Sequence, residues 1–320
     1  MISVNEEVRQ KLTSADYAVA GGVSGVVTRC SCQPLDVIKI RFQLQVEPIR
    51  KDAVGVKYWS ISQATQQIIK DEGISALWKG HVPAQLLSVL YGVAQFSSFE
   101  FFSKVASKES QKSPFVHFIC GASAGCFATV ASFPCDVIRT RLVAQGEPKV
   151  YSGICDAALK IYTKEGSKAF FKGLSPTLIQ VAPHTGAQFA FYAGFKEVWR
   201  KLVSDDTIAT TSSLIPVSLS GSLICGSLSG LCAKTLVYPF DLARKRLQVQ
   251  GFEEAREKFG KVFRCSGLMD CLWVTLKEEK VRGLFKGLNP SLIKAGTTTA
   301  IHFCAYEQMC HILTIWHSKI

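Results

Sequence analysis

The alternation of apolar and polar stretches along the chain predicts six long helices, two in each third of the sequence. In the first third the apolar stretches cover roughly residues 15–40 and 82–106, and each is long enough to cross a lipid bilayer as a helix. None is uniformly apolar, because Gly, Ser, Thr and Ala recur throughout. Small residues let helix backbones approach one another, so we expect the helices to pack closely around a polar interior.

Three copies of one sequence element indicate a tandem triplication. The stretch QPLDVIKIRFQLQ at 33–45 returns as FPCDVIRTRLVAQ from Phe133 and as YPFDLARKRLQVQ from Tyr238, with prolines 100 and 105 residues apart. A second shared element, EGISALWKG, EGSKAFFKG or EKVRGLFKG, ends at Gly80, Gly173 and Gly287. Units of this length are too long for a solenoid. We therefore divide the chain into three repeats, 1–110, 111–207 and 208–320.

The proline of each copy lies inside a helical pattern. A proline in this position removes a backbone hydrogen bond and kinks the helix. Three kinked helices in a three-fold arrangement can converge at one end and close a cavity there. After the first long helix of each repeat we expect a short surface helix, near 60–71, 152–163 and 267–278.

Composition favours a membrane protein, and the distribution of charge predicts its orientation. Hydrophobic residues make up 48% of the chain and charged residues only 19%. Of the 37 lysines and arginines, seven, seven and eleven fall in 39–79, 139–172 and 244–286, the loops within the three repeats. The positive-inside rule puts these loops on one side of the membrane and both termini on the other. The first residues lack the apolar core of a cleavable signal, so we expect internal targeting information.

Other classes of protein fit less well. The net charge of +12 would suit a nucleic-acid-binding protein, but there is no zinc-ligand spacing and no basic helix with interleaved aromatic residues. The twelve cysteines are scattered, and we interpret them as small buried hydrophobes rather than disulfides or metal ligands. The histidines lack a paired nucleophile and acid, and there is no phosphate-binding Gly-Lys-Ser/Thr loop. We therefore expect no enzyme, no metal and no nucleic-acid partner.

The triplicated motif points to a family. Pro-x-Asp-x-x-Lys/Arg-x-Lys/Arg, followed some 30 to 40 residues later by Glu-Gly-x-x-x-x-aromatic-Lys-Gly, resembles the signature of the mitochondrial carrier family and covers nearly the whole chain. One departure is Lys280, which replaces Gly and is expected to alter only a loop or helix end. The resemblance implies an all-α protein with six transmembrane helices in three pseudo-three-fold repeats. It also implies a monomer in the mitochondrial inner membrane, with both termini in the intermembrane space.

The resemblance further implies a gate at each end of a central site. On the matrix side, signature acids pair with bases of neighbouring repeats. The expected pairs of this matrix gate are Asp36–Arg139, Asp136–Arg244 and Asp241–Lys39. Gln43 and Gln248 match the family's glutamine braces, and the second repeat has Val143 instead. Such a ring is costly to desolvate, so its net contribution to stability is small and it can break in every cycle. On the outer side the family pattern is fragmentary, and Glu100 with Lys196 remains the one complete bridge.

Charged residues at membrane depth are candidates for the substrate site. Arg29 and Lys234 each lie five residues before a signature proline, and Lys294 occupies a family contact position seven residues after Gly287. The remaining contact positions are Leu87, Gln180 and Val181. We expect the three bases to face one cavity without matching buried acids. Such an excess of positive charge selects an anion, and arginine with lysine suits phosphate oxygens. Any one base alone would also fit a lipid phosphate.

One helical turn further along, Tyr91 and His184 could stack on and hydrogen-bond a heterocyclic ring. Stretches such as AQGEPKVY add to the resemblance, which implies transport of thiamine pyrophosphate into the matrix in exchange for nucleotides. Two alternatives stay open: an exchanger of adenine nucleotides or coenzyme A with the same fold, and a proton-leak or structural membrane protein. No intramembrane acid lies ready to relay protons, which disfavours a proton leak.

The lipid cardiolipin is an expected partner. Helix N-termini bind phosphates, and basic pockets on this side of a membrane bind cardiolipin. The stretches YSG at 151–153 and CSG at 265–267, together with the three Lys-Gly pairs, place such termini near the membrane surface. The first repeat has Trp59 and Ser60 where the glycine motif would stand, so its lipid site is expected to be the weakest.

Overall fold

The computed structural model describes residues 13–49, 55–105, 114–204, 219–252 and 264–319. Within these ranges the chain forms α-helices and short 3-10 helices, and no strands. The six long helices are α2 (Ser14–Leu44), α4 (His81–Val105), α5 (Pro114–Ala144), α7 (Leu174–Ser204), α8 (Leu219–Gln248) and α10 (Leu288–Lys319). The three shorter ones are α3 (Ile61–Glu72), α6 (Ile154–Glu165) and α9 (Leu268–Gly283), close to where surface helices were predicted.

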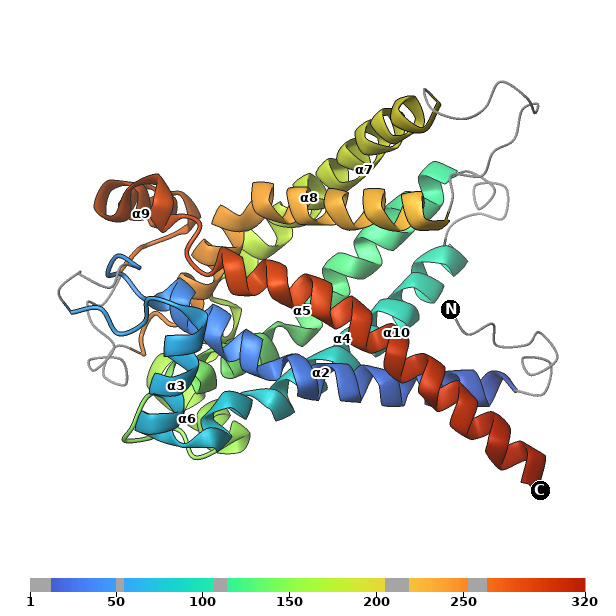
Figure 1. Ribbon diagram of the computed structural model, residues 1–320. Coiled ribbons are helices and arrows are strands. Elements are labelled where there is room, and N and C mark those ends of the chain that lie inside the picture. Colours follow the sequence, from blue (N-terminus) through green and yellow to red (C-terminus); the bar gives the residue numbers. More distant parts are fainter. Residues whose placement is uncertain (1–12, 50–54, 106–113, 205–218, 253–263, 320) are drawn as a thin grey trace.

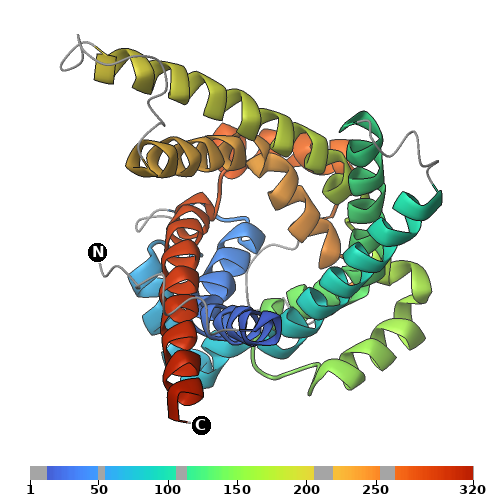
Figure 2. The same ribbon diagram turned by 90° about the vertical axis from the view of Figure 1, so that its right-hand side faces the viewer.

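The long helices surround a common axis, and the short helices lie together at one end of it (Figures 1 and 2). Neighbouring repeats meet along α4 and α5, α7 and α8, and α10 and α2, so the last helix closes the ring against the first. The two ends of the described chain lie at the end opposite the short helices (Figure 1). This placement agrees with the predicted parity of six crossings.

The signature prolines lie inside the first long helix of each repeat, as predicted. Pro34 is in α2, Pro134 in α5 and Pro239 in α8. The segments that follow these prolines contact one another and are largely buried. Three hydrophobic clusters form there, each joining the end of one of these helices to the short helix that follows it. The best-packed part of the protein is therefore the short-helix end.

The outer surfaces of the long helices are apolar. On α4, for example, Val82, Leu86, Val89, Val93 and Phe96 recur every three or four residues and are 42–78% exposed. An exposed apolar stripe of this extent needs a nonpolar covering, which lipid supplies. By length and hydropathy alone, one segment of the described chain, Ile119–Ala144, qualifies as a membrane span. The small and polar residues that let the other long helices pack also lower their hydropathy.

Lys280 keeps the backbone conformation of the glycine that it replaces. Its φ and ψ are 60° and −171°, whereas the equivalent Gly73 and Gly166 have φ of 83° and 78° with ψ of 167° and 178°. The helical path kinks at Lys280, and α9 then continues to Gly283. The substitution thus alters a helix end, as expected, but it also places a side chain in a backbone region that suits glycine. Such a conformation costs about 1–3 kcal/mol.

Candidate substrate site and gates

The ion pairs predicted for the matrix gate are present, with each signature carboxylate paired to a base of a neighbouring repeat. The pairs lie where α2, α5 and α8 meet, and their side chains are 5–19% exposed. The nitrogen–oxygen distances are 2.5 Å for Lys39–Asp241, 2.5 Å for Arg139–Asp36 and 2.8 Å for Arg244–Asp136. The ring of ion pairs is therefore complete in this conformation.

Two of the three pairs carry the predicted glutamine brace. Gln43 Nε2 donates to Asp241 Oδ2 at 3.3 Å and to the Tyr238 hydroxyl at 3.0 Å. Gln248 Nε2 donates to Asp136 Oδ2 at 2.5 Å. Both glutamines are fully buried. Each brace therefore adds a neutral donor to a carboxylate that already accepts a charged one.

The third pair, Asp36–Arg139, has Val143 in the brace position. Val143 is buried and lies against the motif glycine of the first repeat, since a Cβ on Gly80 would come within 2.8 Å of Val143 Cγ2. The φ of Gly80 is +76°, so this position requires glycine both for its conformation and for the close approach. Val143 offers no hydrogen-bond donor, and the glutamine-type brace is absent at this pair.

Sequence reasoning missed a second base on Asp136. Lys245 is buried, and its Nζ lies 3.1 and 3.0 Å from the two carboxylate oxygens of Asp136. It also donates to Thr140 Oγ1 and Gln248 Oε1, both at 2.9 Å. The sequence shows an extra base at Lys245, between two signature bases where the other repeats have Ile40 and Thr140, but the repeat does not indicate its partner.

A second ring consists of one arginine–glutamate–lysine group in each repeat, and its three arginines are buried. They are Arg41, Glu72 and Lys79; Arg141, Glu165 and Lys172; and Arg246, Glu279 and Lys286. These are the second signature base and the glutamate and lysine of the second motif. Because they recur in all three repeats, the sequence could have predicted this contact.

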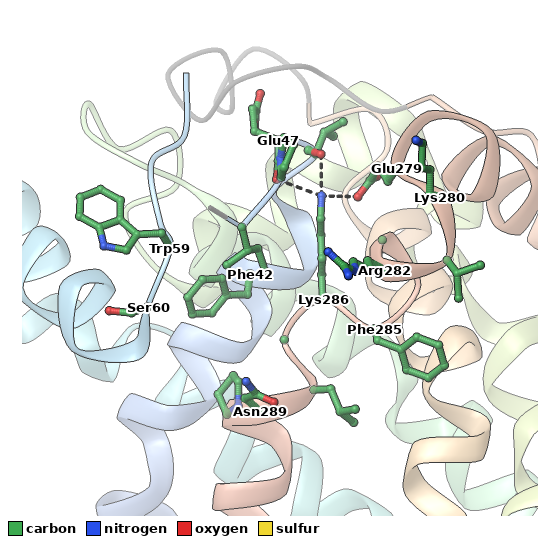
Figure 3. Close-up of a pocket in the computed structure, with 18 of the residues that line it drawn as sticks. Phe42, Glu47, Trp59, Ser60, Glu279, Lys280, Arg282, Phe285, Lys286 and Asn289 are labelled. Atoms are coloured by element: carbon green, nitrogen blue, oxygen red, sulfur yellow. Dashed lines mark hydrogen bonds and ion pairs between the residues drawn. The ribbon is translucent and has the colours of Figure 1, made fainter. Parts of the chain in front are cut away.

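Burial by itself would raise the pKa of Glu72, one carboxylate of this ring. Hydrogen bonds from Arg41 at 2.5 and 2.7 Å, the charge of Arg41 and a contact with Lys79 outweigh that effect and lower the pKa. In the third repeat, Lys286 also donates to the backbone carbonyls of residues 45, 46 and 47 at 3.1, 2.6 and 3.0 Å (Figure 3). This lysine therefore joins the third repeat to the carbonyl end of α2.

The three predicted substrate bases converge, but one of them has an acidic partner. Arg29 Nη1 donates to the Ala84 carbonyl at 3.4 Å, and Lys234 Nζ donates to the Ser291 carbonyl at 3.1 Å. Lys294 Nζ instead donates to Asp36 Oδ1 at 2.6 Å. The charge of Asp36 acts on all three bases, so each of them lies in the neighbourhood of this gate carboxylate. The expectation that the three bases lack matching acids is therefore wrong for Lys294, because the kink brings Asp36 of α2 against α10.

The neutral side chains of the predicted site are placed less uniformly. Gln180 has a buried Oε1 without a hydrogen-bond partner, and the charges of Lys234 and Asp241 act on the nearby His184. Leu87 is half-buried, and Val181 is 49% exposed. The hydroxyl of Tyr91 lies 4.0 Å from where a Cβ on Gly125 would be, so this ring reaches the contact between α4 and α5. His184 thus lies near Lys234, whereas Tyr91 lies at a contact between helices.

The outer gate is not formed in this conformation. Glu100 pairs with Lys104 on its own helix at 2.7 Å, and these two side chains are 68% and 74% exposed. The ring of the matrix gate is complete while the outer carboxylate points to its own helix. The predicted pairing of Glu100 with Lys196 is not formed here and stays a prediction.

A groove of about 1690 Å³ lies between the third and first repeats, beside the start of α3 and the start of α10 (Figure 3). Its lining includes Trp59, Ser60, Lys280 and Arg282. The Ser60 hydroxyl accepts the backbone N–H of Gln63 at 3.2 Å, whereas the glycines that precede α6 and α9 make no side-chain cap. Ser60 thus uses one of the amides that a bound phosphate would need. The groove lies where the weakest of the three lipid sites was predicted.

Comparisons with known proteins agree with this geometry. The family described as mitochondrial carrier protein matches residues 10–110, 110–202 and 216–315, one segment in each repeat. The chain is 46% identical over 303 residues to the mitochondrial thiamine pyrophosphate carriers of Homo sapiens and Bos taurus, covering 94% of this chain and 92% and 93% of theirs. It is 39% identical over 307 residues to mitochondrial thiamine diphosphate carrier 1 of Arabidopsis thaliana, covering 91% of each chain. Three family matches, three copies of the signature and a ring of six long helices show that the chain belongs to the mitochondrial carrier protein family.

Proposed function

We propose that this protein transports thiamine pyrophosphate across the mitochondrial inner membrane into the matrix, in exchange for nucleotides. The observation that carries the proposal is that Lys294 binds Asp36 of the closed ring of ion pairs and that Arg29 and Lys234 also lie near this carboxylate. Relatives that are 46% identical over most of the chain are named for this cargo. Three cations, of which only Lys294 is paired with a carboxylate of the described chain, leave an excess of positive charge, which suits a diphosphate.

The bases can exchange their present acceptors for phosphate oxygens. Arg29 and Lys234 donate to neutral backbone carbonyls, and hydrogen bonds to charged phosphate oxygens are shorter and stronger. Gln180 and His184 lie one turn apart on α7, where an amide and an imidazole can contact the rings of thiamine. The apolar side chain of Leu87 restricts the shape of the site. The buried, unpartnered oxygen of Gln180 is an acceptor for a ligand donor such as the aminopyrimidine amine.

Transport follows from a central site with a gate at each end. The short-helix end faces the matrix and both termini face the intermembrane space, in keeping with the basic loops of the three repeats. In this conformation the matrix gate is complete and the outer bridge is not, so the site is accessible from the intermembrane space. Loading the site lets the protein close the outer gate with Glu100 and Lys196 and open the matrix gate. The protein acts as a monomeric transporter rather than an enzyme.

The choice of cargo is tested with purified protein in liposomes. Uptake of labelled thiamine pyrophosphate, ADP and coenzyme A is measured against the same internal nucleotide. We expect thiamine pyrophosphate to be taken up fastest and to compete best against the other two. Faster uptake of ADP or coenzyme A would make the protein a nucleotide or coenzyme A exchanger of the same fold, and uptake of protons alone would make it a leak.

Cardiolipin is the lipid that we propose to bind at the starts of the short helices. The helices α6 and α9 begin at Gly153 and Gly267 without a side-chain cap, so their first amides can donate to a lipid phosphate. Ser60 blocks part of the equivalent site on α3. Added cardiolipin should raise the melting temperature in detergent, and Ser60→Gly should enlarge that rise. A melting temperature that does not respond to cardiolipin would contradict this proposal.

A further inference from the structure

The three corners of the matrix gate, each defined as one signature carboxylate with the groups bound to it, are held differently. Asp136 accepts Arg244, Lys245 and the brace Gln248. The Asp241 corner has Lys39 and the brace Gln43. The Asp36 corner has no glutamine, and its second donor is Lys294. A residue of the substrate site therefore takes the place of a brace at this corner.

The two oxygens of Asp36 are divided between the gate and the substrate site. Arg139 Nη2 binds Oδ2 at 2.5 Å, and Lys294 Nζ binds Oδ1 at 2.6 Å. The two other substrate bases, Arg29 and Lys234, hold backbone carbonyls at 3.4 and 3.1 Å. Among these three bases, Lys294 is thus the one that binds a gate carboxylate directly.

Substrate and gate compete for Lys294. A lysine ammonium is a compact point charge. When it donates its strongest hydrogen bond to a diphosphate oxygen, its contact with Asp36 weakens. A ligand can shift a conformational equilibrium only by interacting differently with the two conformations. Competition for Lys294 supplies such a difference, because the contact with Asp36 exists while the matrix gate is closed. Arg139 would then hold the corner without a brace, since Val143 offers no donor.

We propose that Lys294 links substrate binding to the matrix gate, and that loading the site opens the gate first at the Asp36 corner. This inference rests on the proposed function, because the competing group is the diphosphate of the cargo. The other two corners contain no substrate base within hydrogen-bond distance of their carboxylates and separate afterwards. The gate therefore opens asymmetrically, although its three ion pairs follow the three-fold repeat.

Removing the carboxylate that competes with the cargo for Lys294 tests the proposed link between substrate binding and the gate. In Asp36→Asn the charge that holds Lys294 is gone, so thiamine pyrophosphate should bind the purified protein roughly three- to ten-fold more tightly. Asp136→Asn is the matched control, because it also weakens the gate but leaves the contact of Lys294 intact. Equal tightening in both variants would overturn the proposal, since it would show a general effect of loosening the gate. In a Lys294→Gln background, Asp36→Asn should no longer tighten binding, and persistent tightening would also overturn it.

A second variant tests the same proposal if the asparagine variants do not fold. Val143→Gln supplies the missing brace at the Asp36 corner, as Gln43 and Gln248 do at the other two. It should raise the melting temperature of the unloaded protein and slow exchange in liposomes at least three-fold, with thiamine pyrophosphate affinity unchanged. An unchanged exchange rate in a folded Val143→Gln protein would contradict the assigned order of opening. If the wild-type protein binds no thiamine pyrophosphate, the proposed function fails; if it binds and exchanges the cargo but these variants behave otherwise, only this inference fails.

Discussion

Replacing Lys280 by glycine should stabilise the protein. Lys280 has φ 60° and ψ −171°, a region that costs a residue with a side chain about 1–3 kcal/mol. Glycine removes that cost but returns about 0.5–1 kcal/mol through its greater freedom in the unfolded chain. The net gain is about 0.5–2 kcal/mol. With an unfolding entropy of about 2.1 cal/mol/K per residue, this corresponds to a rise of roughly 1–3 °C for the 320-residue chain.

The assay is thermal unfolding of the purified protein in detergent, with two control variants. Lys280→Ala removes the side chain's charge but keeps a Cβ in the same backbone conformation, so it should gain little. Gly166→Lys places a side chain at the equivalent position of the second repeat, where φ is 78°, and should lower the melting temperature. The reasoning is refuted if Lys280→Gly melts at or below the wild-type temperature, or if Lys280→Ala gains as much.

Three further predictions concern burial, acidity and selectivity. Glu279→Gln leaves the buried Arg246 without its carboxylate, which should lower the free energy of unfolding by about 3–5 kcal/mol and reduce the folded yield. Glu197→Gln, at an exposed pair, should lower it by less than about 1 kcal/mol. Because the pKa of Glu72 is lowered in the folded protein, its contribution to stability is complete above about pH 4.5 and is lost as the pH falls through that lowered pKa. The acid-induced fall in melting temperature should therefore be shallower in Glu72→Gln. Leu87→Ala should reduce discrimination between thiamine pyrophosphate and ADP in competition assays without abolishing exchange, and unchanged selectivity would remove Leu87 from the site.

Features that repeat three times were predictable from the sequence. The prolines and the short helices follow from a motif that recurs in three equivalent places, and the pairing of Asp36 with Arg139 was implied by the resemblance of that motif to the mitochondrial carrier signature. The same reasoning could have found the buried contact of Arg246 with Glu279, because its partners also recur. At these positions the repetition of the motif indicates which residues occupy equivalent places in the fold.

Features carried by a single repeat were not predictable in the same way. Lys294 and Asp36 are 258 residues apart, and their contact depends on how α10 closes the ring against α2. Lys245 has no counterpart in the other repeats, so no symmetry indicated its contact with Asp136. The predicted bridge between Glu100 and Lys196 is not formed here, where Glu100 pairs with Lys104, and a sequence does not indicate which conformation is populated.

The measurement that tests the central claim most directly is uptake of labelled thiamine pyrophosphate by wild-type protein and Lys294→Ala in matched liposomes, corrected for folded yield. Each charge-assisted contact to the diphosphate is worth about 1.5–3 kcal/mol, so losing one should weaken binding about ten-fold or more. We predict rapid, saturable uptake by the wild-type protein and a loss of most uptake at low substrate concentration in Lys294→Ala, whose folded yield should fall far less. Normal uptake by a folded Lys294→Ala protein, or no uptake of thiamine pyrophosphate by the wild-type protein, would contradict the account.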